Sequence, residues 1–284
     1  MKIRRFLLEN EKGQQFRMDN LNEGCFLVSP SNLGYSYEAD FVRLGYSFIE
    51  NNREIQQKNP SGTAYFKSYD KVKEFIDYVE NSNELKWVYI VPFDSEEKTY
   101  YRDVIIVKLD KTERTGRWIS CPIEFAGLSL WYEENTVVYT ITPQENEIRW
   151  DFKWNSRFSD YNSRRLQYIN KGHIEAPIYA EIDGNVVNPR IELYIEGQLH
   201  QTVEITTQIQ QFEKLIYDTR ENQFMIARQK TDGTIESLFS LDCINPANDN
   251  VMRIPKNKSC EISLTANNEV LSARLTIYPR YKAV

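Results

Sequence analysis

The chain has 284 residues, of which 41% are hydrophobic and 13% aromatic, and its 35 basic and 41 acidic side chains give a formal net charge of −6. These proportions exclude a disordered chain, because disorder goes with few aromatic and β-branched residues. An acidic chain without a long basic segment also argues against a protein that coats DNA or RNA, whose affinity comes from Lys and Arg neutralising phosphates.

No segment approaches the ~20 consecutive apolar residues of a transmembrane helix. The N-terminus begins with basic residues, as a signal peptide does, but its apolar run covers only residues 6–8. The hydrophobic region of a signal peptide needs about 7–15 residues. We therefore expect no membrane association and no signal peptide, and a protein that stays in the cytoplasm where it is made unless another route releases it.

Residues 69–81 carry a helical pattern. The apolar positions at i, i+3, i+4 and i+7 are Val72, Phe75, Ile76 and Val79. This spacing predicts one apolar face, with charges on the other, and the face is expected to pack on a sheet. Ser68 is placed to cap the helix, and Asp70 falls in the first turn, where the helix dipole favours an anion.

Most of the remaining sequence alternates as strands do. The clearest runs, rich in β-branched and aromatic residues, are 104–109, 136–141, 186–195 and 273–278. Turn signals between strand-like runs, each predicting a hairpin, fall at 183–185, 196–198, 232–233 and 267–268. From about residue 170 onward, the chain therefore reads as a series of hairpins, which is typical of a β-sandwich or jelly roll.

The length is enough for two domains or one large all-β unit. A polar, turn-rich stretch between residues 130 and 170 is the best candidate for a boundary. We place the boundary close to residue 133, which predicts an N-terminal domain over 1–133 and a C-terminal domain over 134–284. Repeats of fixed period are not visible, which disfavours a solenoid or propeller.

Residue types that carry chemistry are scarce. The two histidines, His173 and His200, lack the GxSxG or catalytic-Cys context of a nucleophilic enzyme and are expected to be structural or on the surface. The scattered cysteines, expected to be buried free thiols, are Cys25, Cys121, Cys243 and Cys260. Close-spaced Cys or His pairs and glycine-rich phosphate loops are absent from the sequence. The sequence thus predicts no catalytic, cofactor-binding or metal-binding residue, and no cofactor.

Adjacent acidic side chains are candidates for the carboxylate pair of a glycosidase. Glu96–Glu97 and Glu133–Glu134 are adjacent. Neighbours on one strand point to opposite faces, so neither pair can flank a sugar bond by itself, and solvated loops are expected. Asp40, Asp103 and Asp110 remain candidates to converge with a distant glutamate.

Aromatic residues allow three interpretations. The chain has 18 tyrosines and the tryptophans Trp87, Trp118, Trp131, Trp150 and Trp154. Aromatic rings pack in cores, anchor subunit interfaces and stack on sugars. Composition and pattern alone predict a two-domain, mainly β protein. It shows no catalytic motif, and we expect it to bind a partner or a ligand.

The order of several short motifs is more specific. A Gly-x-x-x-Phe-x-x-Tyr segment at 62–69 leads into the helix. The motifs that follow are a Trp in 85–89, Tyr-x-Asp in 100–104, Lys-Thr-Glu in 109–113, a Phe in 121–125 and Trp-Tyr in 130–132. Later signals are residues 168–177, 181–184 and 188–191 and the last strand, 273–281. In order and spacing, this pattern resembles the distal tail protein family of long-tailed bacteriophages.

The resemblance implies a structural protein rather than an enzyme. It implies a mainly β fold in which an N-terminal split-barrel or β-sandwich-like ring domain with one helix precedes a C-terminal galectin-like β-sandwich. Six copies would form a ring at the virion tail tip, between the tail tube protein and the tail-associated hub and baseplate proteins, after synthesis in the bacterial host cytoplasm. A receptor-binding protein and host cell-wall glycan are further partners that it allows, and it identifies no interface residue.

Two other functions stay open. A carbohydrate-binding module would use the C-terminal sandwich and show two or three coplanar exposed rings in a groove. A wall-degrading glycosidase or esterase would show paired acids or a triad in one cleft. A ring carrying six weak sugar sites would combine the structural and the sugar-binding functions through avidity.

Overall fold

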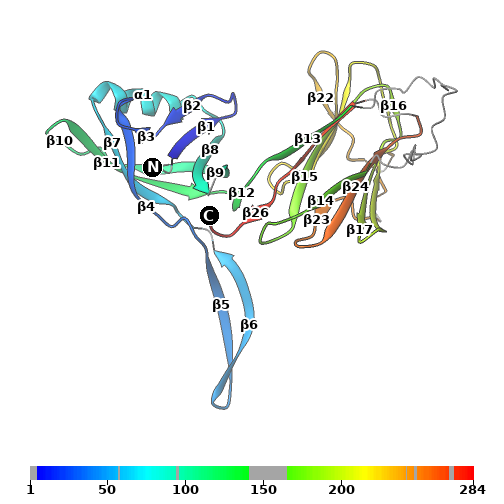
Figure 1. Ribbon diagram of the computed structural model, residues 1–284, viewed down its shortest axis with the longest axis horizontal. Coiled ribbons are helices and arrows are strands. Elements are labelled where there is room, and N and C mark those ends of the chain that lie inside the picture. The colour runs from blue at the N-terminus through cyan, green and yellow to red at the C-terminus, as the bar shows by residue number, and fades with distance from the viewer. Residues whose placement is uncertain are drawn as a thin grey trace, which may run out of the picture. The chain divides into compact units, whose positions relative to one another are not determined.

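The computed structural model describes residues 5–56, 58–93, 96–140, 165–240, 242–245, 248–268 and 272–284. The chain forms two compact units, labelled by element in Figure 1. One comprises Met1–Glu133 with Tyr281–Val284, and the other comprises Glu134–Arg280. Strands dominate the described residues, with a single α-helix, so the predicted mainly β fold with one short helix is confirmed.

The domain assignment made from the sequence differs from the structure at the last four residues. They belong with the N-terminal unit and not with residues 134–280. The Tyr281 ring meets the Tyr100 ring edge-on at 5.3 Å between centroids, and Tyr281 and Val284 pack against the N-terminal core. Burial of these apolar groups accounts for the return of the chain to its first unit.

The N-terminal unit is built on one large antiparallel sheet, whose main path runs in the order β2-β1-β8-β9-β11-β7-β4-β3. Its strands are β1 (Arg5–Asn10), β2 (Gln15–Arg17), β3 (Asp19–Asn20), β4 (Cys25–Ser31), β7 (Ser61–Phe66), β8 (Leu85–Phe93), β9 (Glu96–Leu109) and β11 (Trp118–Gly127). Short strands beside this path are β10 (Arg114–Thr115), β12 (Trp131–Tyr132) and β26 (Arg280–Tyr281). Strands β5 (Ser36–Leu44) and β6 (Ser47–Gln56) form a separate two-stranded ribbon.

The predicted helix is confirmed as α1 (Tyr69–Glu80). The Ser68 side chain accepts a hydrogen bond from the Lys71 backbone N–H at 3.2 Å, which is the predicted N-cap. Val72 and Phe75 are buried, as expected for the face that packs on the sheet. Ile76 is the exception, because it lies at the edge of the apolar stripe and remains exposed.

Aromatic rings fill the core of the N-terminal unit. Trp87 stacks on Phe125 at 4.8 Å and lies 5.8 Å from Trp131, and all three rings are fully buried. Such ring pairs are worth about 0.5–1.5 kcal/mol each beyond the area that they bury. For Trp87 and Trp131, core packing is therefore the interpretation that holds, among the three left open by the sequence.

The C-terminal unit contains two antiparallel sheets. The larger follows the path β13-β25-β15-β20-β21-β22 with β23 beside β15, the smaller follows β14-β24-β17-β18, and β16 pairs with β19. The larger sheet comprises β13 (Asn135–Thr140), β15 (Ala176–Asp183), β20 (Lys214–Asp218), β21 (Met225–Gln229), β22 (Ile235–Ser237), β23 (Arg253–Ile254) and β25 (Ser272–Ile277). The other strands are β14 (Arg165–Ile169), β16 (Val186–Val187), β17 (Arg190–Ile195), β18 (Gln198–Glu204), β19 (Gln208–Ile209) and β24 (Ser259–Thr265).

One hydrophobic core joins the two sheets of this unit. Ile178 and Ile182, four residues apart and therefore on the same face of β15, pack in the same buried cluster as Leu193 of β17 and Ile262 of β24. Full burial of each such side chain contributes about 1.5–3 kcal/mol. Side chains of both sheets therefore fill one core.

Two of the four predicted hairpins are confirmed. Residues 196–198 connect β17 to β18 and residues 232–233 connect β21 to β22, and both strand pairs are antiparallel. The other two predictions are wrong, since the turn at 183–185 leads to β16, which pairs with β19, and the turn at 267–268 links strands of different sheets. The run 186–195 is also interrupted at Asn188, whose backbone is left-handed at φ 47°.

Candidate functional site

A two-stranded ribbon of the N-terminal unit, β5–β6, is the most distinctive surface of the described chain. In Figure 1 it leaves the body of that unit as a long hairpin, and its strands pair only with each other in the described sheets. The pairing runs from Ser36 opposite Gln56 to Leu44 opposite Ser47. A two-residue turn closes it, and its first residue, Gly45, has φ +65°, a conformation that favours glycine.

Large apolar side chains cover this hairpin. Tyr46 at the tip is 99% exposed and Phe48 is 70% exposed. The exposed apolar residues of the hairpin are Phe41, Val42, Leu44, Tyr46, Phe48, Ile49 and Ile55. Val42 lies opposite Ile49 on one face, and Phe48 lies opposite Arg43 on the other, so both faces carry apolar groups. We call these seven residues the hairpin surface.

A second apolar surface lies on the outer face of the large sheet. Along β9, Val104 is buried in the core, while its neighbours Ile105 and Val107 are 50% and 57% exposed on the opposite face. The backbone N–H of Leu128 donates to the Asp103 carbonyl at 2.8 Å, which holds the exposed Leu128 beside the same strand. Ile105, Val107 and Leu128 form what we call the β9 surface.

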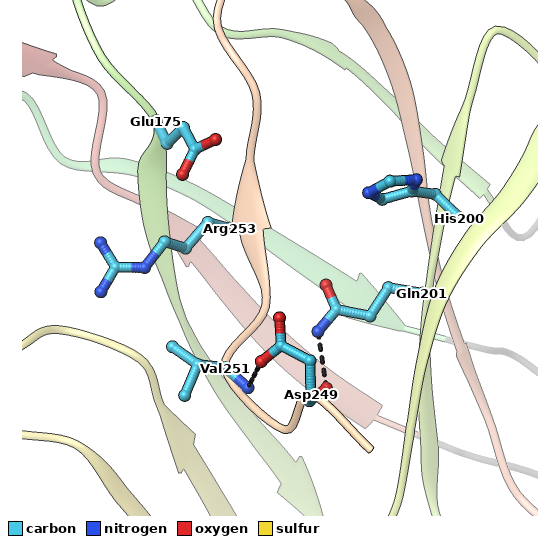
Figure 2. A pocket seen from close by; sticks show the side chains of 6 residues that line it. All are labelled: Glu175, His200, Gln201, Asp249, Val251 and Arg253. Carbon is cyan, nitrogen blue, oxygen red and sulfur yellow. Dashed lines mark hydrogen bonds between the residues drawn. The ribbon is translucent and has the colours of Figure 1, made fainter. Parts of the chain in front are cut away.

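A polar pocket of about 420 Å³ lies in the C-terminal unit. Figure 2 shows His200 and Gln201 of β18 on one side and Glu175, Val251 and Arg253 on the other, with Asp249 at the base. The Gln201 amide donates to the Asp249 carbonyl at 2.7 Å, and the Asp249 carboxylate accepts from the Val251 N–H at 2.9 Å. The pocket therefore offers an imidazole, an amide, carboxylates and a guanidinium, and none of its lining residues is Phe, Tyr or Trp.

An ion-paired network adjoins this pocket. The Glu221 carboxylate accepts hydrogen bonds from Arg253, which lines the pocket, and from Arg280, whose Nη1 lies 2.6 Å from Oε1. Burial raises the pKa of Glu221, but the hydrogen bonds and charge of Arg280, followed by those of Arg253, outweigh burial and lower the pKa to about 2. Glu221 thus stays ionised and neutralises part of the arginine charge beside the pocket.

Asp40, Asp103 and Asp110 are the candidates to converge with a distant glutamate. Asp40 lies on the hairpin, Asp103 accepts from the Tyr132 hydroxyl at 2.8 Å, and Asp110 pairs with Lys108 at 2.6 Å. Asp103 and Asp110 are seven residues apart along the chain and therefore up to about 23 Å apart in extended backbone. The partners of Asp103 and Asp110 are thus Tyr132 and Lys108, and convergence of one of the three carboxylates with a distant glutamate stays a hypothesis.

The adjacent glutamates follow the expectation in part. Glu133 and Glu134 lie outside strands, as expected, and Glu133 Oε1 is buried without a hydrogen-bond partner in the described structure. The expectation of a loop is wrong for the other pair, because Glu96 and Glu97 belong to β9. Glu97 forms an ion pair with Arg5 at 2.5 Å.

Both histidines and three of the four cysteines lie as the sequence indicated. His173 and His200 are exposed, and His200 is the one that lines the pocket. All four cysteines are free; Cys25, Cys121 and Cys260 are buried, and Cys243 is half-buried. Burial raises the pKa of the Cys25 thiol to about 12, which makes it unreactive. Trp118 is half-buried, and Trp150 and Trp154 lie outside the described residues.

Sequence reasoning missed both apolar surfaces and the pocket. The hairpin surface had one usable signal, which was Gly45 between two runs of aromatic and β-branched residues. Within the described ranges, no three His, Cys, Asp or Glu side chains are grouped to hold a metal ion. Nor does a helix in that part of the chain have the length and apolarity of a membrane span.

The comparisons with known proteins cover both units. Residues 5–128 match the family model described as the N-terminal domain of the distal tail protein. A chain in the structure of the phage P2 baseplate, in its activated conformation with calcium, is 14% identical, with 100% of each chain covered and a TM-score of 0.67. The SPP1 Dit protein is 9% identical, with 98% of each chain covered and a TM-score of 0.57.

A comparison with curated protein sequences finds no match. The two solved structures are too distant in sequence to show more than a shared fold, but that fold extends over both units. The order of motifs in the sequence, the family match over the N-terminal unit and the shared fold therefore agree. Residues 5–128 of this chain therefore match the N-terminal domain of the phage distal tail protein, and both units share the fold of the two solved structures.

Proposed function

We propose that six copies of this chain form a closed ring through their N-terminal units, and that the ring joins the tail tube to the baseplate of a phage. From the match to a distal tail protein domain, we infer that the chain is a structural component of a phage tail and not an enzyme. The hairpin surface is the observation that carries the proposal of a ring.

The hairpin surface would be unfavourable in an isolated subunit. An unsupported two-stranded hairpin is marginal in water, and large exposed apolar patches mark interaction sites. Phe41 and Phe48 are 59% and 70% exposed, and burial of such a side chain contributes about 1.5–3 kcal/mol. Packing against a neighbouring subunit would supply that burial.

The β9 surface is the candidate receiver. A closed ring of more than two subunits uses head-to-tail interfaces, in which each subunit offers two different patches. Ile105, Val107 and Leu128 lie on the sheet of the N-terminal unit, whereas the hairpin surface lies on the separate ribbon. One N-terminal unit thus carries the two patches that such an interface requires.

The solved structures support a place at the baseplate. One similar chain is part of the phage P2 baseplate, and SPP1 Dit is described as a paradigm of the hub adsorption apparatus of phages that infect Gram-positive bacteria. By analogy, we assign tail tube, hub and baseplate proteins as partners of this chain. The C-terminal unit, whose two sheets around one core support the galectin-like sandwich implied by the resemblance, would contact other baseplate proteins.

Native mass spectrometry across a concentration series tests this proposal. The full chain is measured alone and mixed with the tail tube protein of the same phage. We expect a species of six times 33.6 kDa, alone or on the tube, and six-fold rings in negative stain. A species that stays monomeric or dimeric under both conditions would contradict the ring.

Sugar binding is the second candidate, and the polar pocket supports it. His200, Gln201, Asp249 and Glu175 supply donors and acceptors that suit the hydroxyl groups of a saccharide. The pocket lacks the stacked rings expected of a carbohydrate module. A glycan array with the full chain, compared with a His200→Ala variant, tests it; a signal that the variant does not reduce would exclude this pocket as the sugar site.

A further inference from the structure

The hairpin is held at its base by contacts with distant parts of the N-terminal unit. On the first leg, the Trp131 indole N–H donates to the Leu33 carbonyl at 2.9 Å. Between the legs, the Asn32 amide donates to the Asn59 carbonyl at 2.9 Å. These bonds tie both ends of the ribbon to one another and to β12.

A buried arginine holds the second leg. Arg102, 4% exposed, donates to the Lys58 carbonyl at 3.2 Å and to the Ser129 carbonyl at 2.9 Å. Its guanidinium lies 5.8 Å from the Trp131 ring centroid, so the two anchors contact each other. Gly127 leaves the space for this group, since a Cβ there would lie 2.3 Å from Arg102 Nη2.

Lys282 and Ala283 form the last set of contacts at the base of the hairpin. Lys282 donates from Nζ to the Tyr37 hydroxyl, and the same ammonium lies 5.7 Å and 5.1 Å from the ring centroids of Tyr35 and Tyr37. The Cβ of Ala283 lies 3.9 Å from the position that a Gly34 Cβ would take. The tail therefore covers the segment where β4 has ended and the hairpin begins.

The Tyr37 ring contacts a cation from the other strand as well as the cation of the tail. The Arg53 guanidinium, from β6, lies 5.0 Å from the Tyr37 ring centroid, and Lys282 lies 5.1 Å from it. A cation over the face of an aromatic ring is attracted by the ring's negative face. The tail cation therefore contacts the first strand at Tyr37, and the second strand contacts the same ring through Arg53.

We propose that the C-terminal tail, residues 281–284, is a positioning element that sets the hairpin for ring assembly. The tail follows the entire C-terminal unit in sequence but packs with the N-terminal unit. The hairpin is therefore fixed only in a chain that contains residues 281–284, and chains that stop before them are kept out of the ring. The role in assembly rests on the proposed function, whereas the fixing of the hairpin does not.

Hydrogen exchange of the full chain tests the fixing. Removal of residues 282–284, and separately Lys282→Met, is expected to raise amide exchange about tenfold over residues 34–56. Exchange in β15 and β25 of the C-terminal unit stays unchanged. Lys282→Arg, which keeps a cation over the rings, restores slow exchange, and Lys258→Met, at an exposed lysine of the C-terminal unit, has no effect. Unchanged exchange over 34–56 in both tail variants would overturn the proposal.

Ring formation is measured on the same variants. If the wild-type chain forms hexamers, the tail deletion is expected to lower their fraction at least about tenfold. Equal hexamer fractions would overturn the role of the tail in assembly and leave the proposed ring intact. Absence of wild-type hexamers both alone and with the tail tube protein would contradict the proposed function, while the exchange experiment would still decide whether the tail fixes the hairpin.

Discussion

Trp131 donates its indole N–H to the backbone carbonyl of Leu33 at 2.9 Å, across 98 positions of sequence. The bond joins β12 to the segment that enters the hairpin. Trp87, whose ring lies 5.8 Å away, is equally buried, but its indole N–H has no hydrogen-bond partner in the described structure. The two tryptophans are therefore matched in burial and differ in this bond.

Trp131→Phe is expected to destabilise the N-terminal unit by about 1–2 kcal/mol more than Trp87→Phe. Both changes remove the same volume, but only the first leaves a carbonyl without its donor, and only the second removes an unpaired buried N–H. Differential scanning calorimetry of the full chain, read at the transition of the N-terminal unit, measures the difference. Equal losses for the two variants would show that the bond to Leu33 does not stabilise the unit.

Phe41→Ser is expected to weaken ring assembly and leave the subunit folded. The side chain is 59% exposed, so its removal changes subunit stability by only about 0.5 kcal/mol or less, whereas an aromatic interface anchor is worth about 2 kcal/mol or more. Light scattering across a concentration series should show the assembly midpoint rise at least about tenfold. Phe239→Ser, at a 57% exposed position of the C-terminal unit, is the matched control and should leave the midpoint unchanged.

Glu221→Gln is expected to lower the melting temperature of the C-terminal unit near neutral pH but not at strongly acidic pH. The folded pKa, about 2, lies below the ordinary value of 4.5, so the carboxylate stabilises the fold above pH 4.5. That stabilisation is lost as the pH falls from 4.5 to about 2. Melting curves of both proteins from pH 7 to pH 2 should therefore converge in this range, and a constant gap throughout would contradict the assignment of Arg280 and Arg253 as its cause.

Gly184→Ala is expected to destabilise the C-terminal unit by about 3 kcal/mol or more, because a Cβ there would lie 1.8 Å from the Gln210 carbonyl oxygen and neither backbone can move without repacking. Gly197→Ala is the comparison. It has open space around it but a left-handed backbone at φ +82°, and it should cost about 1–2 kcal/mol. Calorimetry distinguishes the two values, and a milder effect at Gly184 would show that this turn can relax.

Local signals could be predicted from the sequence. The N-cap at Ser68 and the spacing of Val72 and Phe75 define α1, because a helix is specified by residues three and four apart. The alternation of the runs 136–141 and 273–278 is equally local, and the structure has β13 and β25 there. Strand partners were less predictable, since the turn at 267–268 changes sheets and the hairpin pattern looks the same in either case.

The candidate site could not be predicted in the same way. The hairpin exposes apolar residues on both faces, so alternation carries no information about which side is covered. Its anchors join residues 98 and 44 positions apart, and the tail contact joins Lys282 to Tyr37, for which no short-range pattern exists. The order of motifs indicated the family but not the surfaces that would assemble it.

Crosslinking between Tyr46→Cys and Val107→Cys tests the central claim most directly. Both positions are exposed, at the hairpin tip and on the β9 surface, whereas three of the four native cysteines are buried and the wild-type chain serves as their control. A short bismaleimide should link the two single variants when they are mixed, and should convert the double variant into a ladder of bands that ends at six subunits. A ladder that stops at two, or Tyr46→Cys linking to itself as well as to Val107→Cys, would show a two-fold contact and contradict the ring.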